Sequence, residues 1–543
     1  MLERKGLSGI HRTVPRLTRA RWIGLWSMVA WVSAVGVTRA AITESQVLVV
    51  YNSASAEGTA LKNSYLAAHP GIPANHVFDL NNPAMLTGDI LYSSFISQIR
   101  TPIRNYLTSL GAAETQGIIA MALIRPFPHR IWDTDNPFVG DDPFGLQGEF
   151  LPPGSGGQGD ATCASVDAEL VLLWQNLDTG EAGGTMDSKS DNLIDNPYHQ
   201  SASEINFFTR GNIQTAKTYV NNSNVVWNLG GAGATQLTPG DMYLVCRIDG
   251  PSLAAAQASI TRAQQLYANK ASQIALLDAY AVSGSACPDL DNSALFPSAD
   301  PQYAGNDYDE CRTALQAAGW TVRLDNTANF IDSAEETRAL IAFATYGENH
   351  SLFGCGEDPL GSGVYPTNGY RYARGAIFNP LESYSGRSLN GIGQQPSIPQ
   401  GQVADFIAAG GTFAIGNVWE PLSSNLADNE FAFVRMLVQQ RTWAEAAYSA
   451  IPGLSWQHVV LGDPLGRFAA ILNDPGLPKG DMDANGVVDG RDIQWFVNVM
   501  TSGISAYRAA FPTRDPIARG DFDNDLQVTA SDVPGFMAAL LAP

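Results

Sequence analysis

The side chains best suited to bind a metal ion lie near the C-terminal end of the chain, where one pattern of oxygen-bearing residues occurs twice. The two copies begin at Gly480 and Gly520. Their oxygen-bearing side chains fall at positions 1, 3, 5, 9 and 12 of a loop, namely Asp481, Asp483, Asn485, Asp489 and Asp492 in the first copy and Asp521, Asp523, Asp525, Thr529 and Asp532 in the second. This spacing is typical of an EF-hand-type loop, in which position 7, here Val487 or Gln527, adds a backbone carbonyl. Because Ca²⁺ takes about six to eight oxygen ligands, the pattern predicts two calcium sites.

Each loop needs an element that holds it, and the apolar residues after each loop recur at helical spacing. They are Ile493, Phe496, Val497 and Met500 after the first loop, and Val533, Phe536, Met537 and Leu540 after the second. Their offsets from the last aspartate of the loop are the same in both copies, so each loop is predicted to lead into one amphipathic helix. The residues before the first loop, LNDPGLPKG, are typical of turns. Each unit is therefore predicted to be a loop plus one following helix.

This stretch, nearly all of 479–543, resembles a type I dockerin module. The resemblance implies a small all-α domain over 480–543 that binds two calcium ions and docks onto a cohesin-like protein. In dockerins, loop positions 10 and 11 help to choose the cohesin, and here they are Gly490–Arg491 and Ala530–Ser531. Because the two pairs differ, symmetric docking in two orientations is not expected. Leu526 occupies position 6 of the second loop, where glycine is expected, so we predict strain or weaker binding there.

Two alternatives stay open for these residues. One is a solvated acidic tail whose spacing arises by chance. The other is a small cap that calcium folds but that docks onto nothing, since a two-helix unit of this size hardly folds without a metal or a partner.

The first forty residues are typical of a secretory signal peptide. They contain seven Lys or Arg and one acidic residue, then the apolar run 22–37 and the small residues around Thr38-Arg39-Ala40. An uncleaved N-terminal anchor is the alternative, and no later segment is long and apolar enough to span a membrane. The whole chain has a net charge of −21, which argues against nucleic acid as a partner. The sequence therefore predicts a secreted or cell-surface protein, and its five cysteines fit no zinc motif.

Residues 41–470 are predicted to form one α/β core domain with a mostly parallel sheet flanked by helices, and 471–479 a linker to the C-terminal domain. Apolar runs that favour strands alternate with helical patterns, as in parallel sheets. The expected strands are 47–51, 76–80, 117–124, 242–248, 274–280, 321–324, 340–346 and 412–418. The expected helices are 57–68, 89–110, 253–269, 308–318, 403–409, 428–440 and 442–450. Segments 125–160 and 347–374 are expected to be loops.

Short motifs in the core resemble a family of uncharacterised secreted bacterial proteins found in genomes that encode exosortase. The motifs are VLVVYNS, SVDAEL, DNPY, CRIDGP, GNVWEP and GDPLGRF. The resemblance covers about 45–470 and implies export and fold, because the family has no established activity. Residues 335–470 also resemble the gingipain-type cysteine peptidase domain, which has a caspase-like α/β fold.

Four side chains are weak candidates for catalysis in the core. A caspase-like peptidase needs a histidine after one strand and a cysteine after the next. His350 follows the strand expected at 340–346, but no cysteine follows the strand at 412–418, and Cys355 shares a loop with His350. Asp167, Glu169 and Glu420 could be paired carboxylates for acid–base work or for a metal. The alternative for these residues is a structural role, which the sequence favours.

The sequence thus favours an exported, non-enzymatic protein of unknown ligand whose C-terminal module binds two calcium ions and serves in docking or capping. The alternative is an extracellular hydrolase of polysaccharide or peptide, a glycosidase or peptidase that is delivered through its dockerin-like module. Dockerins often accompany enzymes of polysaccharide catabolism, which keeps this alternative open.

Overall fold

The computed structural model describes residues 41–85, 87–132, 164–175, 194–210, 213–214, 237–278, 307–325, 331–345, 369–382, 384–386, 389, 403–418 and 426–542. These residues lie within one compact unit, Arg39–Pro543. Among them, no helix combines the length and the apolar character that crossing a membrane requires.

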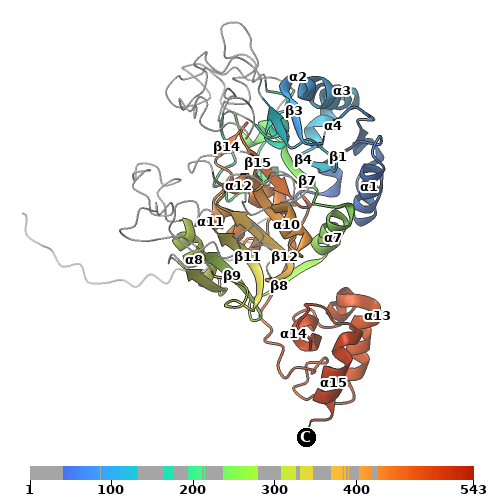
Figure 1. The fold of residues 1–543 in the computed structure, drawn as a ribbon, viewed down its shortest axis with the longest axis vertical. Helices are drawn as coiled ribbons and strands as arrows, with labels where there is room; N and C mark the ends of the chain where they lie inside the picture. The colour runs from blue at the N-terminus through green and yellow to red at the C-terminus, as the bar shows by residue number, and fades with distance from the viewer. Residues whose placement is uncertain are drawn as a thin grey trace, which may run out of the picture. The chain divides into compact units, whose positions relative to one another are not determined.

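The centre of the fold is a ten-stranded sheet (Figure 1). Its strands follow one another across the sheet in the order β10 (Thr321–Asp325), β9 (Gln273–Asp278), β11 (Ala339–Thr345), β12 (Arg371–Pro380), β13 (Phe413–Asn417), β15 (His458–Leu461), β7 (Leu244–Ile248), β4 (Ala120–Ile124), β1 (Val47–Tyr51) and β2 (Val77–Asp79). Neighbouring strands pair in parallel, except that β13 and β15 are antiparallel. The prediction of an α/β fold with a mostly parallel sheet is therefore confirmed.

The strand order divides the sheet into two groups that follow one rule. In β2-β1-β4-β7 and in β10-β9-β11-β12-β13, the first strand along the chain lies inside, the second lies at the outer edge, and the next strands follow on the other side. Strand β15 lies between the groups, pairing with β13 over four residues and with β7 through Leu461 and Arg247. Its four residues are buried, so this seam belongs to the core.

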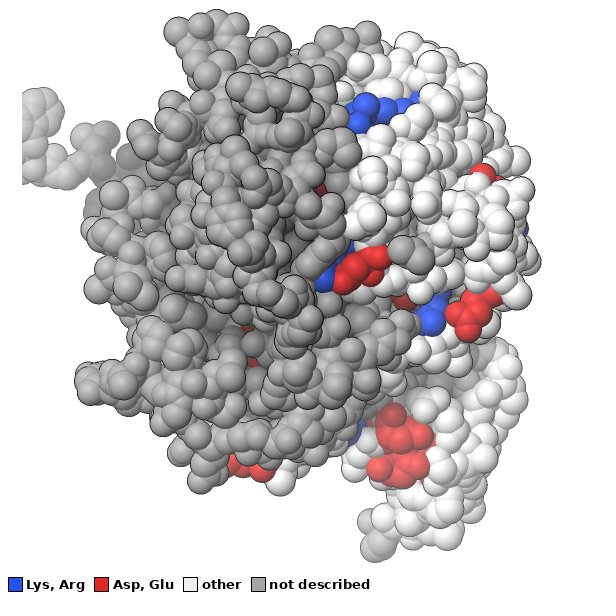
Figure 2. Space-filling view, turned by 45° about the horizontal axis from the view of Figure 1, so that its top comes forward, with Lys and Arg blue, Asp and Glu red and all other residues white. Residues whose placement is uncertain are grey.

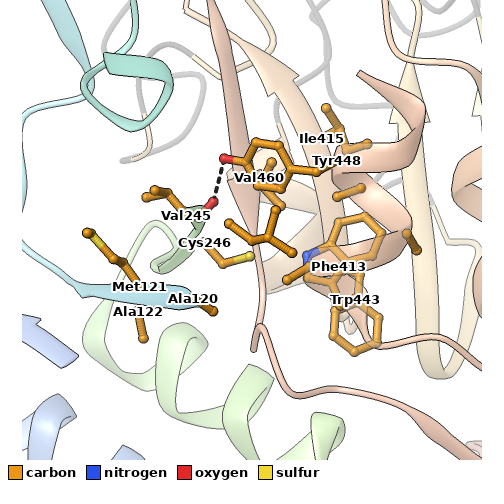
Figure 3. Packing of buried hydrophobic residues seen from close by; sticks show 14 of the residues in the cluster. Ala120, Met121, Ala122, Val245, Cys246, Phe413, Ile415, Trp443, Tyr448 and Val460 are labelled. Carbon is orange, nitrogen blue, oxygen red and sulfur yellow. Dashed lines mark hydrogen bonds between the residues drawn. The ribbon is translucent and has the colours of Figure 1, made fainter. Parts of the chain in front are cut away.

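Aromatic side chains fill the seam between the two groups (Figure 3). The rings of Phe413 and Trp443 lie 5.1 Å apart, and the hydroxyl of Tyr448 donates a 2.8 Å hydrogen bond to the carbonyl of Val245. Gly462 follows β15 at a positive φ of 121°, and a Cβ there would lie 2.6 Å from the ring of Phe413. The close approach of ring and backbone therefore requires glycine at this position.

Helices flank the sheet, and their boundaries follow local capping signals (Figure 1). Helices α1 (Ala56–Ala68), α7 (Leu253–Ala263) and α10 (Val403–Ala408) pack in one row, and α8 (Asp307–Ala317), α11 (Asn429–Leu437) and α12 (Trp443–Ala450) pack in another. Ser55 caps α1 and Ser252 caps α7, each accepting a hydrogen bond from a backbone amide three residues later. Such caps satisfy amides that have no partner within the helix.

Four expectations from the sequence are wrong, two of which concern the segments 89–110 and 125–160. Residues 89–110 are not one helix: Asp89–Leu91 form β3, which pairs with β5 (Arg130–Trp132) inside the segment expected to be a loop. The helix then runs from Tyr92 to Leu110 as α2, a π-helical segment and α3 (Thr101–Leu110). Pro102 at the start of α3 has no amide hydrogen, and the wider π turn before it accommodates that loss.

The two other errors have the same cause, which is pairing with a distant strand. The helix expected at 253–269 ends at Ala263, and β8 (Leu266–Asn269) follows and pairs with β16 (Phe468–Leu472). Gln265 has a positive φ of 50°, which separates helix from strand. Strand β12 begins inside the segment expected to be a loop, and its Gly375, at a φ of 85°, lies against the ring of Phe468.

The C-terminal residues form a small helical module with its own apolar core. Helix α13 (Asp492–Ala510) follows the first acidic loop and kinks at Gly503, α14 (Pro516–Gly520) precedes the second loop, and α15 (Val533–Leu540) follows it. The predicted helices after both loops are thus confirmed, whereas α14 was not predicted. The buried cluster consists of Met482, Phe496, Val499, Tyr507, Val528 and Phe536.

On the face that Figure 2 shows, most of the described surface is uncharged, and acidic side chains gather in small groups. Basic side chains occupy only small spots on the described part of this face. The net charge of −21 is therefore not matched by a broad basic patch on that part.

Candidate metal centres

The first acidic loop brings its carboxylates together around one point. Asp481, Asp483 and Asp492 each offer an oxygen, and these oxygens lie within 4.8 Å of one another. Asp481 accepts hydrogen bonds from the amides of Asn485 at 3.0 Å and Gly486 at 2.9 Å. Asp492, at the start of α13, accepts from the amides of Asp483 at 2.9 Å and Asp489 at 2.8 Å. The first and last aspartates of the loop therefore hold its turn closed.

The second loop repeats these bonds forty residues later in the chain. Asp521 accepts hydrogen bonds from the amides of Asp525 at 3.1 Å and Leu526 at 2.9 Å. Asp532 accepts from the amides of Asp523 at 3.1 Å and Thr529 at 2.8 Å. In this loop the carboxylate oxygens within 4.8 Å of one another come from Asp521, Asp523 and Asp525.

The backbone of the two loops also turns in the same way. Positions 4 and 6 have a positive φ in both: 59° at Ala484 and 94° at Gly486, and 64° at both Asn524 and Leu526. Only glycine adopts this conformation freely, so Leu526 costs the second loop about 1–2 kcal/mol relative to glycine. The predicted departure at position 6 therefore does place a side chain in a strained backbone conformation.

The chemistry of the donors fits a hard cation such as Ca²⁺. Each loop offers four carboxylate or neutral oxygen side chains besides its closing aspartate, with no nitrogen or sulfur donor at the ligand positions. Burial raises the pKa of Asp492 in the first loop and of Asp521 in the second. Crowded carboxylates that lose water in this way are stabilised by a divalent cation, because it supplies the opposite charge and takes their free oxygens.

The core candidates Asp167 and Glu169 have partners of their own. Ser165 caps α5 (Val166–Val171), and both carboxylates lie in that helix. Both carboxylate oxygens of Asp167 accept a hydrogen bond from the Nε of Arg247, at 2.6 and 2.8 Å. Glu169 accepts the hydroxyl hydrogen of Ser455. The other two catalytic candidates, His350 and Glu420, lie outside the described residues.

The pair of Asp167 and Arg247 is fully buried and links distant parts of the core. Arg247 lies in β7 and also donates to the carbonyls of Phe127 and Pro128 after β4. Burial raises the pKa of Asp167 to about 6, although the charge of Arg247 works in the opposite direction. The loss of hydration therefore outweighs the attraction, and Asp167 serves to neutralise a buried arginine.

Two buried aspartates of the core, Asp249 and Asp463, were not among the four catalytic candidates, although both lie in the short motifs of the core. Asp249, in CRIDGP, lines a cavity of 270 Å³ with Glu57, Arg125 and Leu389, and burial raises its pKa to about 6. Asp463, in GDPLGRF, accepts from His69 at 2.8 Å and from the hydroxyl of Tyr65 at 3.1 Å. Their hydrogen-bond partners and cavity neighbours come from distant segments. The motifs therefore contain these aspartates but do not indicate which residues they contact.

Comparisons of the chain with protein families, with curated proteins and with solved structures find no match.

The buried ion pair yields a prediction about stability. Replacing Asp167 with alanine leaves Arg247 charged and buried without its carboxylate, so the free energy of unfolding should fall by about 3–5 kcal/mol. Asp309→Ala is the control, because Asp309 pairs with Arg312 at 2.6 Å on the exposed side of α8 and its loss should cost about 0–1 kcal/mol. Urea denaturation at fixed calcium concentration measures both. Equal losses in the two variants would contradict the structural role of Asp167.

The pKa shifts yield a prediction about pH. The pKa of Asp167 and Asp249 is about 6 in the folded chain against 3.8 for an ordinary aspartate, so the folded state holds protons that the unfolded state has released. Burial alone lowers the pKa of His69, but its hydrogen bonds to Asp463 and Glu44 raise it above 6.5 overall. All three groups therefore favour the folded state at lower pH and lose that contribution as the pH rises through their folded pKa values.

In the presence of a chelator, the free energy of unfolding should be larger at about pH 5 than at about pH 7.5, by about 1 kcal/mol or more. The chelator matters because calcium binding depends on pH in the opposite direction. Asp249→Asn should flatten the profile. A free energy of unfolding that stays level or rises from pH 5 to pH 7.5 in the parent chain would contradict this prediction.

Proposed function

We propose that residues 480–543 are a dockerin-like module that binds two calcium ions, and that through it an exported protein docks onto a partner at the cell surface or outside the cell. The observation that carries the proposal is the repetition of one loop geometry. Two loops forty residues apart share the same ligand positions, the same left-handed positions and equivalent amide-to-carboxylate hydrogen bonds. A solvated tail with chance spacing does not account for this agreement.

The residues that would hold the ions are the ones that the spacing names. In the first loop they are Asp481, Asp483, Asn485, Asp489 and Asp492 with the carbonyl of Val487, and in the second Asp521, Asp523, Asp525, Thr529 and Asp532 with the carbonyl of Gln527. Calcium would supply charge and fix the entry of α13 and α15. The amides already turned toward Asp481 and Asp521 orient the first ligand of each loop.

Exposed apolar side chains on the two helices support docking over simple capping. The rings of Phe496 in α13 and Phe536 in α15 stack 4.1 Å apart and join the helices. Of the other six apolar residues of the predicted helical pattern, Leu540 packs against the small core of the module, and five stay 36–46% exposed in the whole chain, namely Ile493, Val497, Met500, Val533 and Met537. Apolar rows that neither the module nor the core covers are typical of a surface that a partner buries. We infer that a cohesin-like protein is that partner.

Export rests on the signal-like residues 1–40, which lie outside the described residues. The core contributes an α/β fold, and a caspase-like relation to the gingipain-type domain stays a prediction. The hydrolase alternative also stays a prediction, since Asp167 and Glu169 have structural partners and the remaining candidates are not described.

Calcium binding is tested by titration calorimetry on the full chain. The parent should bind two ions, and Asp483→Asn and Asp523→Asn should each remove or weaken one site by at least about tenfold, because a carboxylate ligand becomes a neutral amide. Asp309→Asn, an acidic residue outside the module, is the matched control and should keep both sites. Failure of the parent to bind calcium would remove the basis of the proposal.

Docking is tested by capture of a cohesin-like protein. The immobilised full chain should retain it from the envelope and secreted proteins of the native organism with calcium present, and release it with chelator. Val497→Asp and Met537→Asp place a charge in the exposed rows and should abolish capture, because that charge would lose water at the interface.

Leu477→Asp is the control, since Leu477 is 69% exposed in the linker and outside the rows. Capture that is indifferent to both aspartate substitutions would contradict docking through the exposed rows, and no capture at all would favour a cap that docks onto nothing.

A further inference from the structure

A buried ion pair holds the entrance of the C-terminal module. The two carboxylate oxygens of Asp474, in the linker, accept hydrogen bonds from Arg519 of α14, at 2.9 Å from Nε and 2.8 Å from Nη2. The same carboxylate accepts the amide of Asp515 at 2.8 Å. The side chains of Asp474 and Arg519 are 0% and 3% exposed, so both charges depend on this contact.

The core supplies the other half of this junction. Asn269, at the end of β8, donates to the carboxylate of Asp515 at 2.7 Å and to the carbonyl of Asp474 at 2.8 Å, and its own oxygen accepts the amide of Asp474 at 3.0 Å. The hydroxyl of Tyr267 donates to Asp515 at 2.8 Å, and the guanidinium of Arg508 lies 4.4 Å from the centre of the Tyr267 ring. The module is thus fastened to the core by a buried polar network as well as by the linker.

Arg519 connects this junction to the first metal loop. Its Nη1 donates to the backbone carbonyl of Asp481 at 2.6 Å and lies 3.4 Å from a carboxylate oxygen of that residue. The carbonyl of Arg519 accepts the amide of Gly480 at 2.9 Å. Position 1 of the first loop is therefore placed by the same side chain that Asp474 holds in the junction.

The second loop has a weaker connection to the core. Arg371 of β12 lies 3.8 Å from a carboxylate oxygen of Asp521 and is partly exposed. Leu526 packs its side chain against the apolar core, which explains why the strained position 6 carries leucine in this chain. These contacts border a cavity of 600 Å³ that core and module line together.

We propose that calcium binding at the first loop and fastening of the module to the core are coupled through Arg519, a claim that rests on the proposed calcium function. The carboxylate of Asp474 neutralises the charge of Arg519 and accepts two of its hydrogen bonds. Arg519 can therefore hold the backbone of Asp481 in place without competing strongly with a cation for the Asp481 carboxylate. When the junction loosens, Arg519 loses that partner and turns toward Asp481, where its charge opposes calcium. Because coupling is reciprocal, calcium in the first loop must in turn tighten the junction.

The test measures the affinity of one loop at a time in the full chain. Asp523→Asn inactivates the second loop, so calorimetric titration then reports the first. In this background Asn269→Ala should weaken calcium binding about tenfold and Tyr267→Phe a few-fold, within the usual range of coupling between sites. Asn63→Ala, an exposed asparagine on α1, is the matched control and should leave the affinity unchanged.

Two further readouts separate positioning from general damage. In the reciprocal background, Asp483→Asn, the affinity of the second loop should change by less than about twofold on Asn269→Ala, because the guanidinium of Arg519 donates to Asp474 and to Asp481 of the first loop. Hydrogen exchange of the Asp474 and Asp515 amides should slow when calcium is added. If Asn269→Ala proves misfolded by circular dichroism, Tyr267→Phe, which removes a single hydroxyl, decides the question.

The coupling would be overturned if the folded junction variants bound calcium at the first loop with an affinity within about twofold of the control. The proposed calcium sites themselves would be unaffected by that result. Absence of calcium binding in the control itself would overturn the proposed function and the coupling together.

Discussion

Carboxylates that converge on a small volume repel one another, and this repulsion governs the C-terminal module. Each loop turns backbone amides toward its first and last aspartates, which partly compensates the charge. Burial nevertheless raises the pKa of Asp492 and Asp521, so amides alone do not replace the lost water. In the proposed function a divalent cation completes the compensation, and the helices that follow the loops then enter the small core of the module at defined angles.

The cost of burying an uncompensated charge also explains the ion pairs Asp167–Arg247 and Asp474–Arg519. Asp167 neutralises Arg247 inside the sheet, and Asp474 neutralises Arg519 between core and module. In each pair the arginine also reaches backbone carbonyls of another segment, so it fixes geometry as well as charge. In the second pair the arginine places Asp481, which is position 1 of the first acidic loop. An acidic chain thus uses a few buried arginines to set where segments meet.

The sequence allowed the elements near strong local patterns to be predicted. The loops and the helices after them were found because ligand spacing and apolar spacing repeat together. Strand β8 was missed because the helical pattern of α7 runs on into it, and β12 because Gly375 and basic residues interrupt its apolar run. Pairing with distant strands decides both. The structural role of Asp167 was missed for a similar reason. The sequence suggested a catalytic acid because its partner Arg247 lies 80 residues away in the chain. Helix α14 is too short for a periodic signal, so the junction with Asn269 was also out of reach.

The most direct test of the account is native mass spectrometry of the full chain, purified with calcium and then treated with chelator. The account predicts a dominant species that carries two calcium ions and loses both with chelator, and one that carries a single ion when Asp483 or Asp523 is replaced with asparagine. A chain that retains no calcium, or that keeps two ions in both variants, would contradict it.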